Sequence, residues 1–229
     1  MHLDTDMATA GIGPLAGLKV LELGTLIAGP FAARMMAEFG AEVIKVEATE
    51  GGDPIRSWRY LHEGTSLWWY VQARNKKSIT LNLKDARAQE IARRLALDAD
   101  VVIENYRPGV LEKWGLGYAQ LAALNPATIM VRLSGYGQTG PMRDRPGFGA
   151  IGESMGGIRY VSGHPDRPPV RIGISIGDSI AALHGVIGAM FALRHRDATG
   201  GRGKGVGQMV DVALYEAVFN LMESTVPEY

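Results

Sequence analysis

Short apolar runs alternate along this chain with segments of helical periodicity, and this alternation restricts the possible fold more than any other feature. Apolar runs predict strands at residues 18–23, 42–47, 78–83, 101–103 and 128–133. Helical spacing predicts helices at residues 30–39, 85–97, 108–114 and 119–124. Such alternation is typical of an α/β domain, in which helices wrap a Rossmann-like, mostly parallel sheet. Residues 210–212 and a helix at 213–224 are expected to lead away from that sheet.

The composition is that of a globular protein, because 46% of the 229 residues are hydrophobic and 21% are charged. The 24 basic and 24 acidic residues balance, so the chain lacks the basic excess of a nucleic-acid or membrane-surface binder. Without cysteine it has no disulfide, cysteine nucleophile or thiolate-held metal.

No targeting or membrane segment is predicted. Residues 1–10 carry two acids and no apolar core, unlike a signal peptide. The longest apolar stretch, 180–193, is interrupted by His184 and is too short to span a bilayer comfortably. We therefore expect a cytoplasmic, enzyme-like domain with neither nucleic acid nor membrane as a partner.

Several common site patterns fail on position or spacing. The run Gly11-Ile-Gly13 precedes the first expected strand, whereas a dinucleotide fingerprint follows a strand and opens a helix. Residues 203–205 lack the earlier glycine and the Ser/Thr of a phosphate-binding loop. The five histidines are scattered, so no metal site is predicted, and no Gly-x-Ser-x-Gly elbow of a serine hydrolase is present.

One carboxylate lies immediately before the N-terminus of the apolar helix expected at 180–193. Asp178 lies between Gly177 and Ser179. A helix N-terminus favours negative charge, and glycine lets another molecule approach the backbone closely. An ionised Asp in apolar surroundings can attack an activated acyl group. Alternatively, Asp178 or Ser179 only caps the helix, since both residue types are common N-caps.

Segments in order along nearly the whole chain resemble the class III CoA-transferase family, whose members include formyl-CoA:oxalate CoA-transferase, carnitine CoA-transferase and alpha-methylacyl-CoA racemase. The matching segments are residues 14–24, 28–30, 40–47, 52–53, 75–78, 104–109, 134–141 and 177–179. The resemblance implies that residues 10–199 are the N-terminal part of a large CoA-binding catalytic domain. It implies that residues 200–229 begin a linker toward a small domain absent from this chain, and that the protein is a homodimer of interlocked chains.

By the same resemblance, Asp178 is the catalytic nucleophile. Its carboxylate would attack an acyl-CoA thioester to give a mixed anhydride and free CoA thiolate. The thiolate would return to form an aspartyl-CoA thioester, and a second carboxylate would then take over the CoA. CoA is thus a substrate, and no tightly bound cofactor is implied.

The resemblance also implies a CoA site. Asn75, Lys76, Lys77 and Ser78 would offer charge and hydrogen bonds to CoA, where otherwise the lysines are a solvated pair at a strand edge. The remaining implied contacts are Ala28, at a helix-entry turn; Asn105, Tyr106 and Arg107, along the nucleotide; Lys113; and Tyr136 and Gly137, bordering the active site.

Three departures bear on the branch of the family. Ile27 and Ala48 stand where the formyl-CoA transferase has a glutamine and an arginine, which argues against oxalate/formate specificity. Phe148 stands where the racemase branch has a histidine, and phenylalanine cannot supply the second acid/base group of racemisation.

Residues 145–157, 163–171 and 211–218 look most like the branch that moves CoA from succinyl-CoA to small dicarboxylic acids. Four arginines are candidates to pair with a second carboxylate: Arg143, Arg145, Arg159 and Arg171. An acyl-CoA racemase or epimerase, and a non-catalytic CoA-binding fragment, remain the alternative functions.

Overall fold

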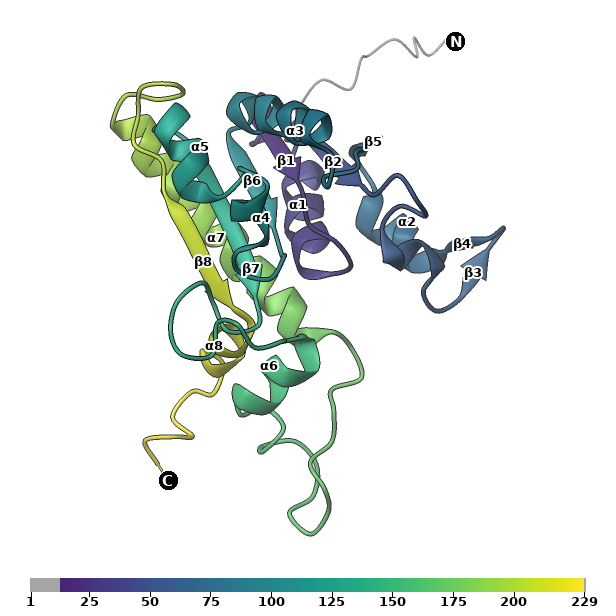
Figure 1. Ribbon diagram of the computed structural model, residues 1–229. Helices are drawn as coiled ribbons and strands as arrows, with labels where there is room; N and C mark the ends of the chain where they lie inside the picture. Colours follow the sequence, from purple (N-terminus) through teal and green to yellow (C-terminus); the bar gives the residue numbers. More distant parts are fainter. Residues whose placement is uncertain (1–12, 229) are drawn as a thin grey trace, which may run out of the picture.

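The computed structural model describes residues 13–228, so residues 1–10, judged above for a signal peptide, lie outside the described part. Its centre is a six-stranded parallel sheet in the order β5-β2-β1-β6-β7-β8 (Figure 1). The strands are β1 (Lys19–Glu22), β2 (Glu42–Glu47), β5 (Lys76–Thr80), β6 (Val101–Glu104), β7 (Ile129–Ser134) and β8 (Met209–Ala213). The predicted α/β class is confirmed, and the direction of strand order reverses between β1 and β6, as in Rossmann folds.

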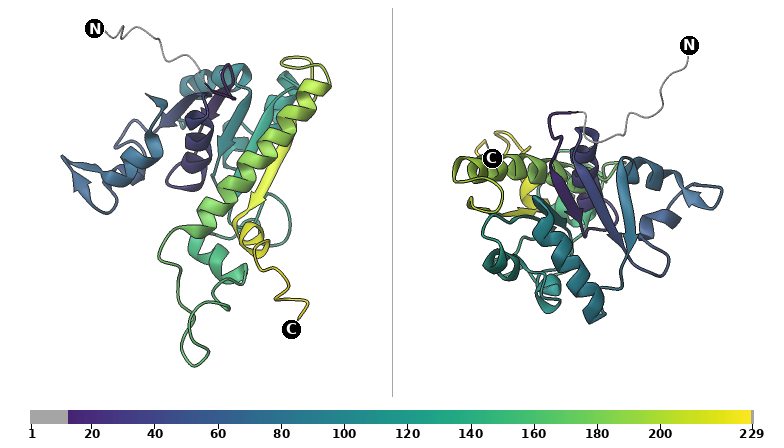
Figure 2. Two further views of the ribbon diagram at one scale, coloured as in Figure 1. Left: turned by 180° about the vertical axis from the view of Figure 1, so that it is seen from behind. Right: turned by 90° about the horizontal axis from the view of Figure 1, so that it is seen from above.

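Helices cover both faces of the sheet, which explains why the central strands β6 and β7 are buried along their whole length (Figure 2). On one face α1 (Ala28–Glu38) and the long α7 (Ile176–Ala198) pack against Val20, Ile103 and Val131. On the other face lie α3 (Ala86–Asp98), α4 (Val110–Lys113) and α5 (Tyr118–Leu124). By length and composition alone α7 could cross a membrane, but here it packs across the sheet as a core helix.

Two parts project from this layered body (Figure 1). One consists of the 3-10 helix η1 (Pro54–Ser57), the small hairpin of β3 (Leu61–His62) and β4 (Thr65–Ser66), and α2 (Leu67–Ala73). The other is α6 (Gly149–Met155) with the long loop that connects it to α7. The hairpin, α2 and α6 were not predicted, because the apolar residues in their sequences show no clear periodicity.

The structure corrects three predictions about individual elements. The expectation that residues 210–212 lead away from the sheet is wrong, because β8 pairs in parallel with β7 and α8 (Leu214–Phe219) follows it. The edge strand β5 starts at Lys76 and ends at Thr80, since Lys76 and Lys77 pair in register with Val43 and Ile44 of β2. The helix expected from residue 180 already begins at Ile176.

Candidate active site

A cavity of about 540 Å³ opens at the carboxyl ends of the central strands, where the strand order reverses. The loop after β1 lines it with Thr25, Leu26 and Ile27, and the loop after β6 adds residues 105–108. Residues at the end of β7, the start of α6 and the start of α7 also line it. Ligands of open α/β sheets bind at such a switch point.

Asp178 lies in this cavity wall, in the first turn of α7. The N-cap residue of α7 is Ser175, so neither Asp178 nor Ser179 caps the helix as the alternative interpretation required. Gly149 leaves the space that the Asp178 carboxylate occupies, because a Cβ at residue 149 would collide with Oδ2. Gly177 permits a similarly close approach, since its Cβ would lie 3.0 Å from the carbonyl oxygen of Gly149.

Burial raises the pKa of Asp178 to about 6, and the negative charge of Glu153 adds to this effect. Two influences oppose the shift: the residue's own backbone amide and the positive charge of Arg171. The carboxylate is therefore mostly ionised at neutral pH, yet it is more basic and less hydrated than an ordinary aspartate. Such a shift in a cleft is typical of a reactive group.

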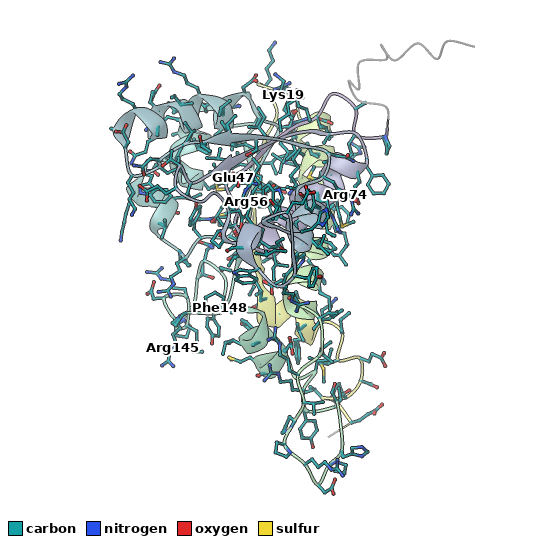
Figure 3. The ribbon with its side chains drawn as sticks, turned by 90° about the vertical axis from the view of Figure 1, so that its right-hand side faces the viewer. Lys19, Glu47, Arg56, Arg74, Arg145 and Phe148 are labelled. Carbon is teal, nitrogen blue, oxygen red and sulfur yellow. The ribbon has the colours of Figure 1, made fainter. Side chains whose placement is uncertain are left out.

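The remaining charge in the cavity is positive. Asp178 is the single carboxylate among the described lining residues, and the cations are five arginines: Arg59, Arg107, Arg143, Arg145 and Arg171. Figure 3 shows Arg145 close to Phe148, which also lines the cavity and is 65% exposed. Of the four arginines predicted to meet a second carboxylate, Arg159 does not reach the wall and instead contacts buried Glu153, with 3.4 Å between Nε and Oε2.

Four residues predicted to contact CoA lie in the same cavity, namely Ala28, Asn105, Tyr106 and Arg107. The side chain of Asn105 is committed to the protein, because its Oδ1 accepts from the Thr25 amide and its Nδ2 donates to the Thr25 carbonyl, both at 2.8 Å. The Tyr106 ring packs edge-on against Trp114, with 5.4 Å between ring centroids. Arg107 is exposed.

The segment of residues 75–78 does not line the cavity. Lys76 is buried, and its Nζ donates to Glu22 Oε2 at 2.6 Å and to the Pro30 carbonyl at 2.7 Å. Lys77 is exposed and pairs with Glu42, while the Ser78 hydroxyl donates to Glu47. Asn75 is exposed and has a left-handed backbone, with φ of 62°. The two lysines thus have separate environments, and the Lys76 ammonium is buried among protein groups, outside the cavity.

Three further predicted residues also lie away from the cavity wall. Lys113 is exposed in the last turn of α4. Tyr136 packs against Tyr215, with 6.0 Å between ring centroids, and Gly137 has a left-handed backbone beside Asp211. Tyr136 and Gly137 directly follow Gly135 in the sequence, and Gly135 does line the cavity. The two residues therefore lie next to the cavity wall without forming part of it.

The profile of CoA-transferase family III matches residues 15–229. The chain belongs to this family. Its relatives include the succinyl-CoA–D-citramalate CoA-transferase of Chloroflexus aurantiacus, which is 56% identical over 94% of this chain and 53% of its own length. The mouse succinyl-CoA:glutarate CoA-transferase is 42% identical over 82% of this chain and 43% of its own length.

A solved structure is also similar to this family III chain. A CAIB/BAIF family protein from Brucella suis superposes with a TM-score of 0.88 and 38% identity, covering 95% of this chain and 57% of that one. The chain thus spans about half the length of the curated relatives it matches.

Sequence reasoning missed one side of the cavity in this family III chain. Trp58 and Arg59 directly follow η1, Trp68 lies in α2, and the Arg59 guanidinium lies 4.5 Å from the centroid of the Trp68 ring. Nothing in the sequence pattern places these residues near Asp178. Within residues 13–228 no cluster of three metal-ligating side chains occurs.

Proposed function

We propose that the protein carrying this chain is a CoA-transferase that moves CoA from succinyl-CoA to a small carboxylic or dicarboxylic acid. The observation that supports it most is the cavity itself, whose described wall holds five arginines and one carboxylate, Asp178, with a raised pKa. Acyl-CoA and a diacid acceptor are both polyanions, and arginine binds carboxylate and phosphate through paired hydrogen bonds. The relatives named for succinyl-CoA and a second acid favour the same substrates.

Asp178 is the proposed nucleophile. Its Oδ attacks the thioester carbonyl, the C–S bond breaks, and the CoA thiolate leaves with the electron pair, giving an aspartyl–acyl anhydride. The thiolate then attacks the Asp178 carbonyl and expels the first acid as its carboxylate. The acceptor carboxylate attacks the aspartyl-CoA thioester, whose C–S bond breaks and releases the CoA thiolate, giving an aspartyl–acceptor anhydride. The thiolate then attacks the acceptor's carbonyl in this anhydride, which forms the new acyl-CoA and releases the Asp178 carboxylate.

Other lining residues serve binding in this proposal. Arg107 and the main chain around Ala28 hold CoA, and Arg143, Arg145 and Arg171, which line the same cavity as Asp178, bind the carboxylates of the acids. No proton has to be moved in any step, because all attacking groups are anions. This fits a wall that, among the residues described, contains neither histidine nor lysine.

A racemase or epimerase is the second candidate from the same family. It needs acid/base groups on both sides of the substrate's alpha carbon. In this cavity Phe148 lies near Asp178, and the described wall has no further titrating carboxyl or imidazole group. A non-catalytic CoA-binding module would not need a nucleophile whose pKa is raised to about 6.

We further propose that the active protein is an interlocked homodimer in the cytoplasm and that residues 200–229 include the start of a linker toward a small domain. The part of the relatives that lies outside the match leaves room for such a domain.

The test is CoA exchange between succinyl-CoA and labelled succinate, measured on the full-length protein. Scrambling of label is expected from a transferase, and not from a racemase or a binding module. Asp178→Asn should lower the rate by at least about 10³-fold, as removal of a nucleophile does. Hydroxylamine trapping followed by peptide mapping should locate the acyl group on Asp178, and modification of another residue would refute the mechanism.

A further inference from the structure

Four buried charges lie beneath the loop that joins β1 to α1, and the proposed mechanism gives them no part. Glu22, Lys45, Asp53 and Lys76 have side chains no more than 1% exposed. Lys45 Nζ lies 2.7 Å from Glu22 Oε1 and 2.9 Å from Asp53 Oδ2, and Lys76 Nζ lies 2.6 Å from Glu22 Oε2. Buried pairs of this kind contribute little net stability compared with apolar packing, so their placement needs another explanation.

Three of these four charged residues also bind the main chain of the β1–α1 loop or of the first turn of α1. Lys45 donates to the Gly24 carbonyl at 2.9 Å, and Lys76 donates to the Pro30 carbonyl at 2.7 Å. Asp53 accepts from the Leu26 amide, with its two oxygens at 3.0 and 3.2 Å. The loop is therefore bound at both ends and in the middle by charges from other segments.

The residue at the centre of the loop has a strained backbone. Leu26 has φ of 64°, a left-handed conformation that disfavours a residue with a Cβ. Asp53 holds the amide of this residue, and Asn105 holds both polar groups of the preceding Thr25. Ile27, the N-cap residue of α1, provides no side-chain acceptor for the amides of the first turn. Without these contacts the loop would relax toward an ordinary backbone conformation.

Thr25, Leu26 and Ile27, which belong to this loop, line the same cavity as Asp178. We propose that Asp53, supported by Lys45 and Lys76, is a positioning residue that keeps Leu26 in its left-handed conformation and so fixes the wall against which the acyl-CoA lies. This inference rests on the proposed CoA-transferase function. Asp53 does not line the cavity itself. It also accepts from the Ile55 amide at 3.0 Å as the N-cap of η1, the segment that leads to Trp58 and Arg59, so the Leu26→Gly rescue described next assigns its effect to the β1–α1 loop.

The experiment compares Asp53→Ala with and without Leu26→Gly in the full-length protein. Asp53→Ala should lower kcat/KM for CoA exchange by about 10²-fold, the scale of a small misplacement of the reacting groups. Adding Leu26→Gly should restore about fivefold or more, because glycine adopts positive φ without the penalty. Asp53→Asn, which keeps an acceptor for the Leu26 amide, should fall between wild type and Asp53→Ala and guards against a variant that does not fold.

Asp98→Ala is the matched control, since this carboxylate pairs with Lys19 on the surface, and it should leave exchange unchanged. Unchanged exchange in Asp53→Ala, or no gain from Leu26→Gly, would overturn the inference. Amide hydrogen exchange separates this outcome from failure of the proposed function. Faster exchange at Leu26 in Asp53→Asn supports the positioning role even if wild type transfers no CoA, and an unchanged rate refutes it.

Discussion

The carboxylate of Asp178 lies against the Cα of Gly149, in the space that any larger residue would fill with its Cβ. Gly149 is the first residue of α6 and Asp178 is in the first turn of α7, so the contact also sets how closely the two helix starts approach. The orientation of the proposed nucleophile thus depends on the absence of one side chain.

Gly149→Ala should therefore impair catalysis without unfolding the protein. The new methyl group would push the carboxylate out of its present orientation, and we expect kcat to fall by about 10²-fold. Alanine is a better helix former than glycine, so α6 should not be weakened. Gly173→Ala is the control, because a Cβ there meets nothing within 4 Å. Equal activity of the two variants would show that the contact does not orient Asp178.

The raised pKa of Asp178 gives a pH dependence of defined sign. Because only the ionised carboxylate is a nucleophile, kcat/KM should fall about tenfold for each pH unit below about 6. A pH–rate profile with succinyl-CoA measures this limb. A profile that stays flat down to pH 5 would contradict the assignment of Asp178.

The same shift predicts that the nucleophile destabilises the fold. The carboxyl group has a higher pKa in the folded chain than its ordinary 3.8, so folding is favoured at low pH and this contribution is lost as pH rises toward 6. At pH 7, Asp178→Asn should be more stable than wild type, by up to about 3 kcal/mol for a shift of this size. Urea unfolding at pH 7 and pH 4 should show the gain at pH 7 and little at pH 4.

The fold could be predicted from the sequence to the extent that local pattern decides it. Strands such as 101–104 are buried on both faces, so they read as apolar runs, and helices with one apolar face show their period. The hairpin and α2 could not be predicted this way, because they project from the body and their residues follow no period.

The site was predictable only where one short segment carries it. Asp178 has its own local signal, whereas the arginines come from separate parts of the chain and meet only through the topology. The environment of Lys76 could not be predicted for a related reason. Beside exposed Lys77 it reads as a surface residue, and only the tertiary fold reveals that it is buried against Glu22.

Arg171 should determine whether a diacid is preferred as acceptor. Its side chain is 57% exposed in the cavity, and its Nε lies 3.6 Å from Oε1 of the fully buried Glu153, which leaves its outer edge free. Arg171→Ala should raise KM for a diacid by about 10- to 100-fold, the worth of charged hydrogen bonds, and leave a monocarboxylic acid of similar length little changed.

The same variant should move the pH profile. Because the positive charge of Arg171 lowers the pKa of Asp178, its removal should shift the acidic limb to higher pH. Arg167→Ala, on the same loop but outside the cavity wall, serves as the control. Equal changes in KM for the diacid and the monocarboxylic acid would show that Arg171 does not bind the second carboxylate of the acceptor.

Binding of CoA should depend on Arg107 and not on Lys77. Arg107 is exposed in the cavity, so Arg107→Ala should weaken CoA binding by about tenfold and reduce its salt dependence, since one charge contact is lost. Lys77→Ala should change affinity less than about twofold, because this side chain is 73% exposed beside Glu42 and away from the cavity. Calorimetric titration with CoA measures both.

Lys76 needs a different readout. Lys76→Ala would leave the buried Glu22 with one cation fewer, and loss of a buried partner destabilises by about 3–5 kcal/mol. A large drop in thermal stability is therefore expected. A stable Lys76→Ala variant with weakened CoA binding would instead support direct contact between Lys76 and CoA.

The outer face of α7 should be covered in the active protein. Leu183, Ile187, Met190 and Phe191 recur on one side of the helix and are 38%, 50%, 37% and 71% exposed. An exposed apolar stripe of this kind is typical of an interface. In the proposed homodimer, Ile187→Glu should weaken self-association, which sedimentation velocity detects. Ile91→Glu, at a similarly exposed isoleucine of α3, should leave it unchanged.

Residues 1–229 alone should bind an apolar dye and transfer no CoA, or only hydrolyse acyl-CoA slowly, because water reaches the anhydride. Transfer by residues 1–229 at the rate of the full-length protein would show that this chain forms a complete site.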